Sequence, residues 1–148
     1  MAAQWPLVVA RLLTLLPTLP GWSAVTVIDG PLVSADVPTD YVTVGYVEGD
    51  NAGAYTTTQD PNGSQWAEAG TVRSQLNCVT GDADLAGMRT RVFALADAFE
   101  ASVRADRTLG GVLCTYGTSE LDVDVLSLQN SSGTAQQLTF TLRYFTVT

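Results

Sequence analysis

The chain has 148 residues, of which 46% are hydrophobic, and its 15 acidic and 7 basic side chains give a formal net charge of −8. This length suits one domain with a sizeable core, and so acidic a chain repels phosphate backbones, which argues against ordinary nucleic-acid binding. Histidine is absent, which excludes a Ser-His-Asp triad, a Cys-His pair and an imidazole metal site.

The first predicted element is a helix over residues 3–16. Its apolar residues recur at three- and four-residue spacing and form one face, made of Trp5, Val8, Val9, Leu12, Leu15 and Leu16. Pro6 suits the first turn of this helix, and Pro17 and Pro20 end it. The segment superficially resembles a signal peptide, but no basic side chain precedes the apolar run and Arg11 interrupts it. Because the run is also too short to span a membrane, we interpret it as a helix of the folded domain.

Two strands and a long connection are predicted next. Residues 25–28 and 41–47 are rich in β-branched and aromatic residues, which favours strands, and the turn-forming residues 29–31 separate them. Residues 48–65 are rich in Gly, Asn, Thr and Asp and show no apolar periodicity, so they are predicted to form a loop. A loop this long is uncommon in a compact domain. It either contacts a partner or is an unconstrained surface loop.

A strand over residues 66–79 and a helix over residues 83–106 follow. The strand places Val72, Leu76 and Cys78 on one face. The helix has a regular apolar face, made of Leu85, Met88, Val92, Leu95, Phe99 and Val103. Asp82 and Asp84 stand at its N-terminus, as capping and the helix dipole favour, and Gly110 and Gly111 mark its end. The two cysteines, Cys78 and Cys114, are interpreted as buried, reduced thiols.

A β-hairpin is predicted near the C-terminus, with its loop over residues 130–135. We predict that Gln129 pairs with Gln136. This register sets opposite each other Val125 and Phe140, Val123 and Leu142, Leu121 and Tyr144, and Asp122 and Arg143. Leu126 and Leu128 then fall on the polar face, which indicates either a bulge or a face covered by a neighbouring subunit.

The predicted elements add up to an α+β fold, with a single, mostly antiparallel sheet packed against two helices in one domain over residues 1–148. Several phrases occur in a familiar order along this chain. They are LLPTLPG at 15–21, VIDGP at 27–31, YVTVGYV at 41–47, GMRTRVFALADA at 87–98, RADRTLGGV at 104–112 and a closing strand at 138–147. In this ordered set, which covers most of its length, the chain resembles the tail terminator family of long-tailed phages, especially those infecting high-GC actinobacteria.

The resemblance implies a structural virion protein at the tail–neck junction, assembled in the host cytoplasm. The family's subunits form a hexameric ring that stacks on the last ring of the major tail tube protein, stops its polymerisation and docks the head-completion protein of the neck. DNA passes through the lumen of such a ring without specific binding. The resemblance implies no catalytic residue, cofactor, metal or membrane contact.

Two groups of residues are candidates for these contacts. The predicted 48–65 loop offers hydroxyl, amide and aromatic groups for an inter-ring contact, together with the tryptophan at its base; the candidates are Asp50, Asn51, Tyr55, Thr56, Thr57, Thr58, Asp60, Asn62 and Trp66. The tryptophan is equally well explained as a core residue. Glu120, Asp122 and Asp124 form an acidic stripe that is predicted to line the lumen; the alternative is a solvated strand face.

Other functions remain open at this point. Another ring-forming neck adaptor, such as a head-closure or tail-completion protein, has a similar sequence character. A small α+β domain that binds an apolar ligand between its sheet and helices is a candidate of a different class. An enzyme is not expected, because the chain contains no Walker loop, dinucleotide fingerprint or nucleophile elbow. Asp82 and Asp84 lack the other ligands of a calcium loop.

Overall fold

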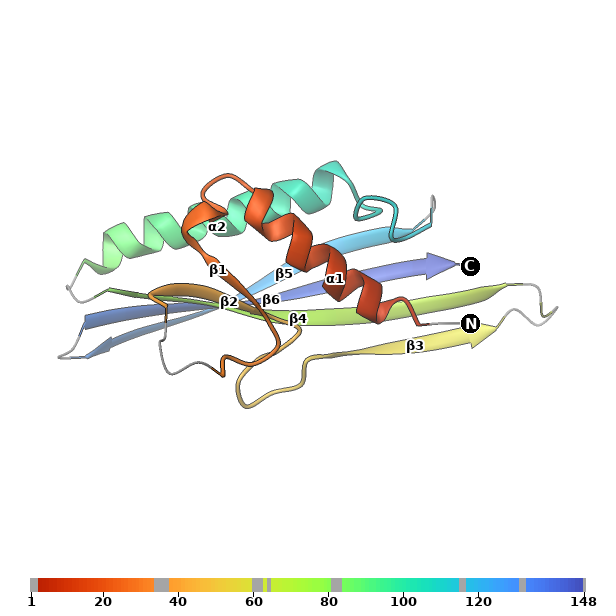
Figure 1. The fold of residues 1–148 in the computed structure, drawn as a ribbon, viewed down its shortest axis with the longest axis horizontal. Helices are drawn as coiled ribbons and strands as arrows, with labels where there is room; N and C mark the ends of the chain where they lie inside the picture. The colour runs from red at the N-terminus through yellow and green to blue at the C-terminus, as the bar shows by residue number, and fades with distance from the viewer. Residues whose placement is uncertain are drawn as a thin grey trace.

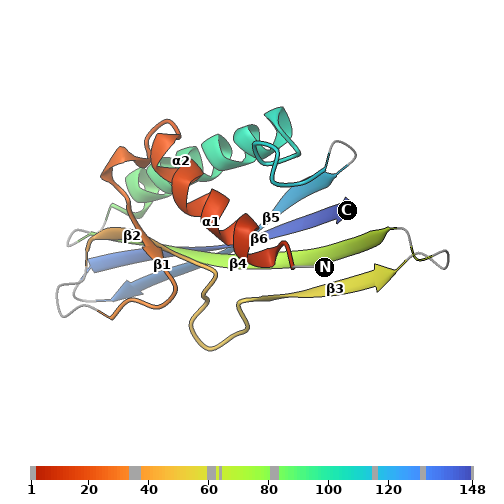
Figure 2. The same ribbon diagram turned by 45° about the vertical axis from the view of Figure 1, so that its right-hand side comes forward.

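The structure, a computed structural model, describes residues 3–33, 38–59, 63, 65–80, 84–114, 117–130 and 133–147. Two helices lie on one face of a mixed, six-stranded sheet (Figure 1), and the view turned by 45° shows the opposite face without a helix (Figure 2). The predicted α+β class is therefore confirmed. That the domain is a subunit of a ring stays a prediction.

The elements follow one another in nearly the predicted order. They are α1 (Trp5–Leu15), η1 (Leu16–Thr18), η2 (Trp22–Ala24), β1 (Thr26–Asp29), β2 (Asp40–Val44), β3 (Gly53–Gln59), β4 (Trp66–Thr80), α2 (Leu85–Ala105), β5 (Thr118–Asn130) and β6 (Gly133–Val147). Within the described ranges, no helix has both the length and the hydropathy needed to cross a bilayer.

The long strand β4 organises the sheet. One edge of β4 pairs with β6 from Ala67 to Thr80, and β5 lies beyond β6. The other edge of β4 is shared, because β3 pairs with residues 66–72 and β2 pairs with residues 75–78. The pair β1–β2 is parallel, and the other ladders are antiparallel. Strands β3 and β5 therefore lie at opposite margins of the sheet.

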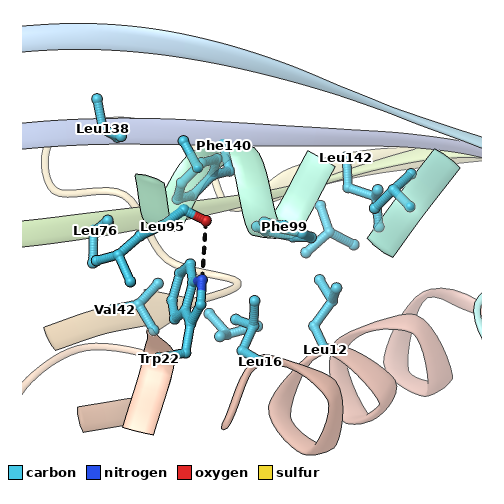
Figure 3. Close-up of a cluster of buried hydrophobic side chains, with 14 of the residues drawn as sticks. Leu12, Leu16, Trp22, Val42, Leu76, Leu95, Phe99, Leu138, Phe140 and Leu142 are labelled. Atoms are coloured by element: carbon cyan, nitrogen blue, oxygen red, sulfur yellow. Dashed lines mark hydrogen bonds between the residues drawn. The ribbon is translucent and has the colours of Figure 1, made fainter. Parts of the chain in front are cut away.

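The core fills the space between the helices and the sheet. Trp22 is fully buried, and its indole N–H donates to the backbone carbonyl of Leu95, at 3.0 Å. Its ring meets the Phe99 ring edge-on at 6.2 Å between centroids, and Phe99 lies 5.1 Å from Phe140 (Figure 3). The predicted alternation of β6 is confirmed, since its even-numbered residues from Leu138 to Tyr144 are buried toward the helices.

The helix α2 has the predicted apolar face, but it ends before Gly110 and Gly111, which were expected to mark its end. Asp84 caps the helix as predicted, because its carboxylate accepts the N–H of Gly87 at 2.9 Å. The helix ends at Ala105, and the Asp106 carboxylate accepts the N–H of Gly110 at 2.8 Å. Gly110 therefore belongs to a turn that follows the helix. Asp82 lies outside the described residues.

The loop predicted over residues 48–65 is largely wrong, because Gly53–Gln59 forms the strand β3. Tyr55, Thr56, Thr57 and Thr58 are good strand formers. However, β3 lies at a sheet margin where every residue after Gly53 is exposed. A strand exposed on both faces needs no apolar alternation, so the periodicity that identifies other strands is missing here.

The predicted hairpin register is wrong by two residues. Asn130 pairs with Gly133, so Val125 faces Leu138 and Asp122 faces Thr141. A shift of two residues keeps every side chain on its predicted face, because side chains alternate with a period of two. The ion pair between Asp122 and Arg143 still forms, at 2.7 Å, as a diagonal contact.

The structure excludes one of the two explanations for the position of Leu126 on the polar face. The β5–β6 register runs without interruption from Thr118 to Asn130, so the predicted bulge is wrong. Leu126 lies on the face without helices and is 52% exposed. Its cover by a neighbouring subunit stays a prediction. The side chain of Leu128 lies outside the described part of the structure.

Candidate assembly surfaces

The face of the sheet turned away from the helices, here called the outer face, is a broad polar surface. Strand alternation places on it mainly hydroxyl and amide side chains, including Thr43, Thr56, Thr58, Thr71, Gln75, Asn77, Gln137, Thr139 and Thr141. The side chains of Thr43, Gln75 and Asn77 are buried, with the loop residues Pro31, Leu32 and Tyr46 beside them. The outer face is therefore mainly polar and not densely charged, although it also exposes Val79, Leu126 and Phe145.

The two arginines described on the outer face are both paired with carboxylates. Arg73 lies 2.6 Å from the Asp50 carboxylate, and Arg143 lies 2.7 Å from that of Asp122. The hydrogen bond from Arg73, with a further one from the Asn51 backbone N–H, lowers the pKa of Asp50. Asp50 thus stays ionised and keeps Arg73 neutralised. Neither arginine is available as an isolated cation for a phosphate group.

The predicted acidic stripe is present as a structural feature. Glu120, Asp122 and Asp124 are exposed and occupy alternate positions of β5, so they share the outer face near one margin of the sheet. Arg143 engages Asp122, and Arg107 lines a pocket together with Glu120. Since Asp122 is used to neutralise Arg143, the net negative charge that the stripe adds to the outer face comes from Glu120 and Asp124. Its position on a ring lumen stays a prediction.

The residues predicted for the inter-ring contact do not form one tip. Asp50 and Asn51 precede β3 and hold Arg73, whose guanidinium donates to the Asn51 carbonyl at 3.5 Å. Trp66 lies at the opposite end of β3, paired with Gln59, and is half-buried. The strand between them spans roughly 20 Å. The candidates are therefore spread along a sheet margin, with Tyr55, Thr56, Thr57 and Thr58 between the two ends. Asp60 and Asn62 lie outside the described residues.

A buried carboxylate that sequence reasoning missed fixes α1 on the sheet. Glu68 of β4 is fully buried, and its Oε2 accepts the backbone N–H of Gln4 at 2.8 Å. The first turn of α1 has no acidic residue of its own, so Glu68 supplies the negative charge that a helix N-terminus favours. Burial, with the neighbouring Glu68 charge, raises the pKa of the Tyr144 hydroxyl. The alternation of β4 signals this burial, because Glu68 shares the face of Val72 and Leu76.

A second buried carboxylate joins α2 to the sheet. Asp40 begins β2, is 9% exposed, and accepts a hydrogen bond from the guanidinium of Arg91. Burial, and the nearby Asp40 charge, raise the pKa of the Cys78 thiol to about 12. The prediction that Cys78 is buried is confirmed, whereas Cys114 is only half-buried. A thiol protonated at neutral pH is a poor nucleophile.

This environment predicts very different reactivity for the two thiols. At pH 8 in the folded protein, we expect a thiol reagent to modify Cys114 at least about tenfold faster than Cys78, because Cys78 is buried and its thiolate is disfavoured. Peptide mass spectrometry of a labelling time course measures both rates. In denaturant the rates should converge. Equal rates in the folded protein would show that the reagent reaches Cys78 as easily as Cys114.

No cluster of three or more Cys, Asp or Glu side chains within the described ranges has the arrangement of a metal site. No known protein family and no curated protein matches this sequence. The surfaces of the sheet, together with the ordered sequence phrases, are therefore the basis on which a function is assigned.

Proposed function

We propose that the chain is a structural virion protein, a tail terminator whose hexameric ring caps the tail tube and joins it to the head-completion proteins of the neck. The ordered phrases from residues 15–21 to residues 138–147 suggest this role. The observation that carries the proposal is the charge of the outer face, where Arg73 and Arg143 are both paired with acids and β5 adds an acidic stripe. In this role the protein binds and positions, and it catalyses nothing.

The outer face suits the lumen of a ring through which DNA slides. Proteins hold DNA mainly by neutralising phosphates with Lys and Arg side chains, so a lumen that lets DNA pass needs few free cations. The outer face offers paired arginines, hydroxyl and amide groups, and the exposed Glu120, Asp122 and Asp124. These carboxylates repel phosphates at short range. We therefore place the outer face toward the lumen and the helices on the outside of the ring.

The inter-ring candidates along β3 fit a contact at one axial end of the subunit. With the strands running along the ring axis, Trp66 and Gln59 lie near one axial end, whereas Asp50 and Asn51 lie beside Arg73, near the middle of β4. The end at Trp66 is then available to one axial partner, either the major tail tube protein or the head-completion protein.

The alternative of a ligand-binding domain has less support. An apolar ligand between sheet and helices needs a cavity there, but Trp22, Phe99 and Phe140 pack against one another in that space (Figure 3). A pocket of about 310 Å³ lies instead where β3, β4 and β6 meet, away from this cluster. Another neck adaptor needs much the same surfaces as a terminator. Its position in the particle distinguishes it.

Cryo-electron microscopy of the virions that carry the chain tests the proposal. We expect a six-fold ring of this chain seated on the last ring of the tail tube, with Glu120, Asp122 and Asp124 facing the lumen. A ring in contact with the portal, and not with the tube, would identify a head-closure protein instead. Absence of the chain from the neck would contradict both versions.

A further inference from the structure

Strand β3 has an edge that nothing in the described structure covers. It pairs with β4 through a continuous register from Gly53 to Gln59, and no described strand lies on its other side. The strand has seven residues, none of them charged and none of them proline. Natural sheets usually protect such an edge with a charge, a proline, a bulge or a very short strand. The other strand on this side of the sheet, β1, has only four residues and is followed by Pro31.

The hydrogen-bonding groups of this edge are set by the β3–β4 ladder. The N–H of Arg73 donates to the carbonyl of Ala52 at 2.9 Å, which identifies this pair as a hydrogen-bonded one. Hydrogen-bonded pairs alternate in an antiparallel ladder, so Ala54, Thr56 and Thr58 direct their backbone groups toward β4. Tyr55, Thr57 and Gln59 consequently direct theirs away from the sheet. These outward groups are a template for another strand.

Strand β5, at the opposite margin of the sheet, also has an edge that no described strand covers. Strand β5 has thirteen residues and pairs only with β6 among the described strands. Successive ladders from β3 through β4 and β6 to β5 are antiparallel, so β3 and β5 run in opposite directions. A β5 strand from another copy, placed beside β3, therefore runs antiparallel to it and continues the same alternation.

Charge favours the pairing of β3 with β5 over the pairing of two β5 strands. Two β5 strands placed edge to edge bring two copies of the stripe formed by Glu120, Asp122 and Asp124 onto one face, where like charges repel. Strand β3 is neutral and has no such conflict. Two β3 strands can pair without repulsion, but their contact leaves both β5 edges open. Pairing β3 with β5 is head-to-tail, and a head-to-tail contact that closes leaves neither of these two edges open.

We propose that the free edge of β3 binds β5 of the next copy of this chain, so that the sheets of neighbouring subunits join into one continuous sheet. This inference rests on the proposed function in that it supplies the lateral contact of the ring. Self-association through these edges is nevertheless measurable without reference to phage tails. The occupant of the β3 edge is thus an acidic strand of an identical chain.

Hydrogen exchange tests which edges meet. We expect the amides of Tyr55, Thr57 and Gln59 to exchange about tenfold more slowly, or slower still, in the self-associated form than in the monomer, together with amides of residues 118–130. The associated form is taken at high protein concentration or on purified tail tubes. Association that leaves residues 53–59 exchanging as in the monomer overturns the proposal, as does a chain that stays monomeric in both settings. Protection of β3 without β5 shows β3–β3 pairing and overturns it too.

Two opposite charges at one position give an independent test. Thr56 is exposed on the outer face of β3, the face on which a bound β5 presents its acids. Thr56→Glu should weaken self-association about tenfold, Thr56→Lys should strengthen it, and high salt should reduce the difference. Sedimentation velocity measures all three effects, with Thr90→Lys on the exposed side of α2 as the control. If both Thr56 variants weaken association equally, β5 is not the partner.

The two proposals fail in different ways. A chain that associates through both edges but is missing from the neck of the virion keeps this inference and contradicts the terminator role. A terminator ring in which neighbouring sheets do not touch at β3 and β5 keeps the role and contradicts the inference.

Discussion

Phe99→Ala is expected to lower the free energy of unfolding by about 3–5 kcal/mol. Phe99 is 1% exposed and lies between Trp22 and Phe140, with ring centroids at 6.2 Å and 5.1 Å. Its removal leaves a cavity between α2 and the sheet and also removes two aromatic contacts. Urea unfolding followed by circular dichroism measures the change, which is a large fraction of the stability of a domain this size.

The same helix provides the matched control. Phe93 lies on α2 but is 37% exposed, so Phe93→Ala removes the same atoms from a site where water already reaches the ring. We expect Phe93→Ala to cost less than about 1 kcal/mol. A similar loss in both variants would show that the aromatic cluster adds nothing to the loss, because Ala has a higher helix propensity than Phe and propensity alone would not destabilise either variant. A negligible loss in Phe99→Ala would contradict the packing of this core.

The core could be predicted because its signals are local and repeated. The spacing of Met88, Val92, Leu95 and Phe99 identifies one face of α2, and all four residues are buried. The alternation from Leu138 to Tyr144 identifies the buried face of β6 in the same way. In both cases one apolar face packs on the core, so apolar residues recur in the sequence with the period of the helix or strand.

The predictions that were wrong concern features that the period of apolar residues does not determine. Strand β3 is exposed on both faces, so nothing in its sequence alternates. The hairpin register depends on the length of its turn, and a shift of two residues leaves the apolar face unchanged, so the pattern cannot distinguish the two registers. The alternation of β4 places Glu68 on the buried face, but it does not reveal that the carboxylate accepts the backbone N–H of Gln4, 64 positions away. Such a long-range contact leaves no trace in a local pattern.

The assembly surfaces were predicted only in part for the same reason. The alternation along β5 was enough to place Glu120, Asp122 and Asp124 on one face. It did not reveal that Asp50 pairs with Arg73, which depends on the β3–β4 ladder. It also did not reveal that β3 has an open edge, because an edge is a property of the whole sheet.

Gly53→Ala is expected to lower the free energy of unfolding by about 2–3 kcal/mol and to loosen β3. Gly53 has a φ of 131°, and a Cβ built there lies 2.0 Å from the backbone oxygen of Thr71. That oxygen also accepts the indole N–H of Trp5 at 2.9 Å, so it is held in place by α1. Either β3 or the Trp5 contact must therefore shift to admit the methyl group.

Gly49→Ala separates this overlap from the cost of backbone conformation alone. Gly49 has a φ of 75° with open space around its Cα, so alanine there should cost only about 1 kcal/mol. Urea unfolding gives both free energies, and hydrogen exchange of residues 54–59 reports whether β3 detaches. We expect faster exchange of β3 in Gly53→Ala only. Since the β3 edge is the proposed site of contact between copies, that variant should also lose self-association while Gly49→Ala keeps it. Retention of full self-association by a variant whose β3 exchanges freely would show that the contact lies elsewhere on the molecule.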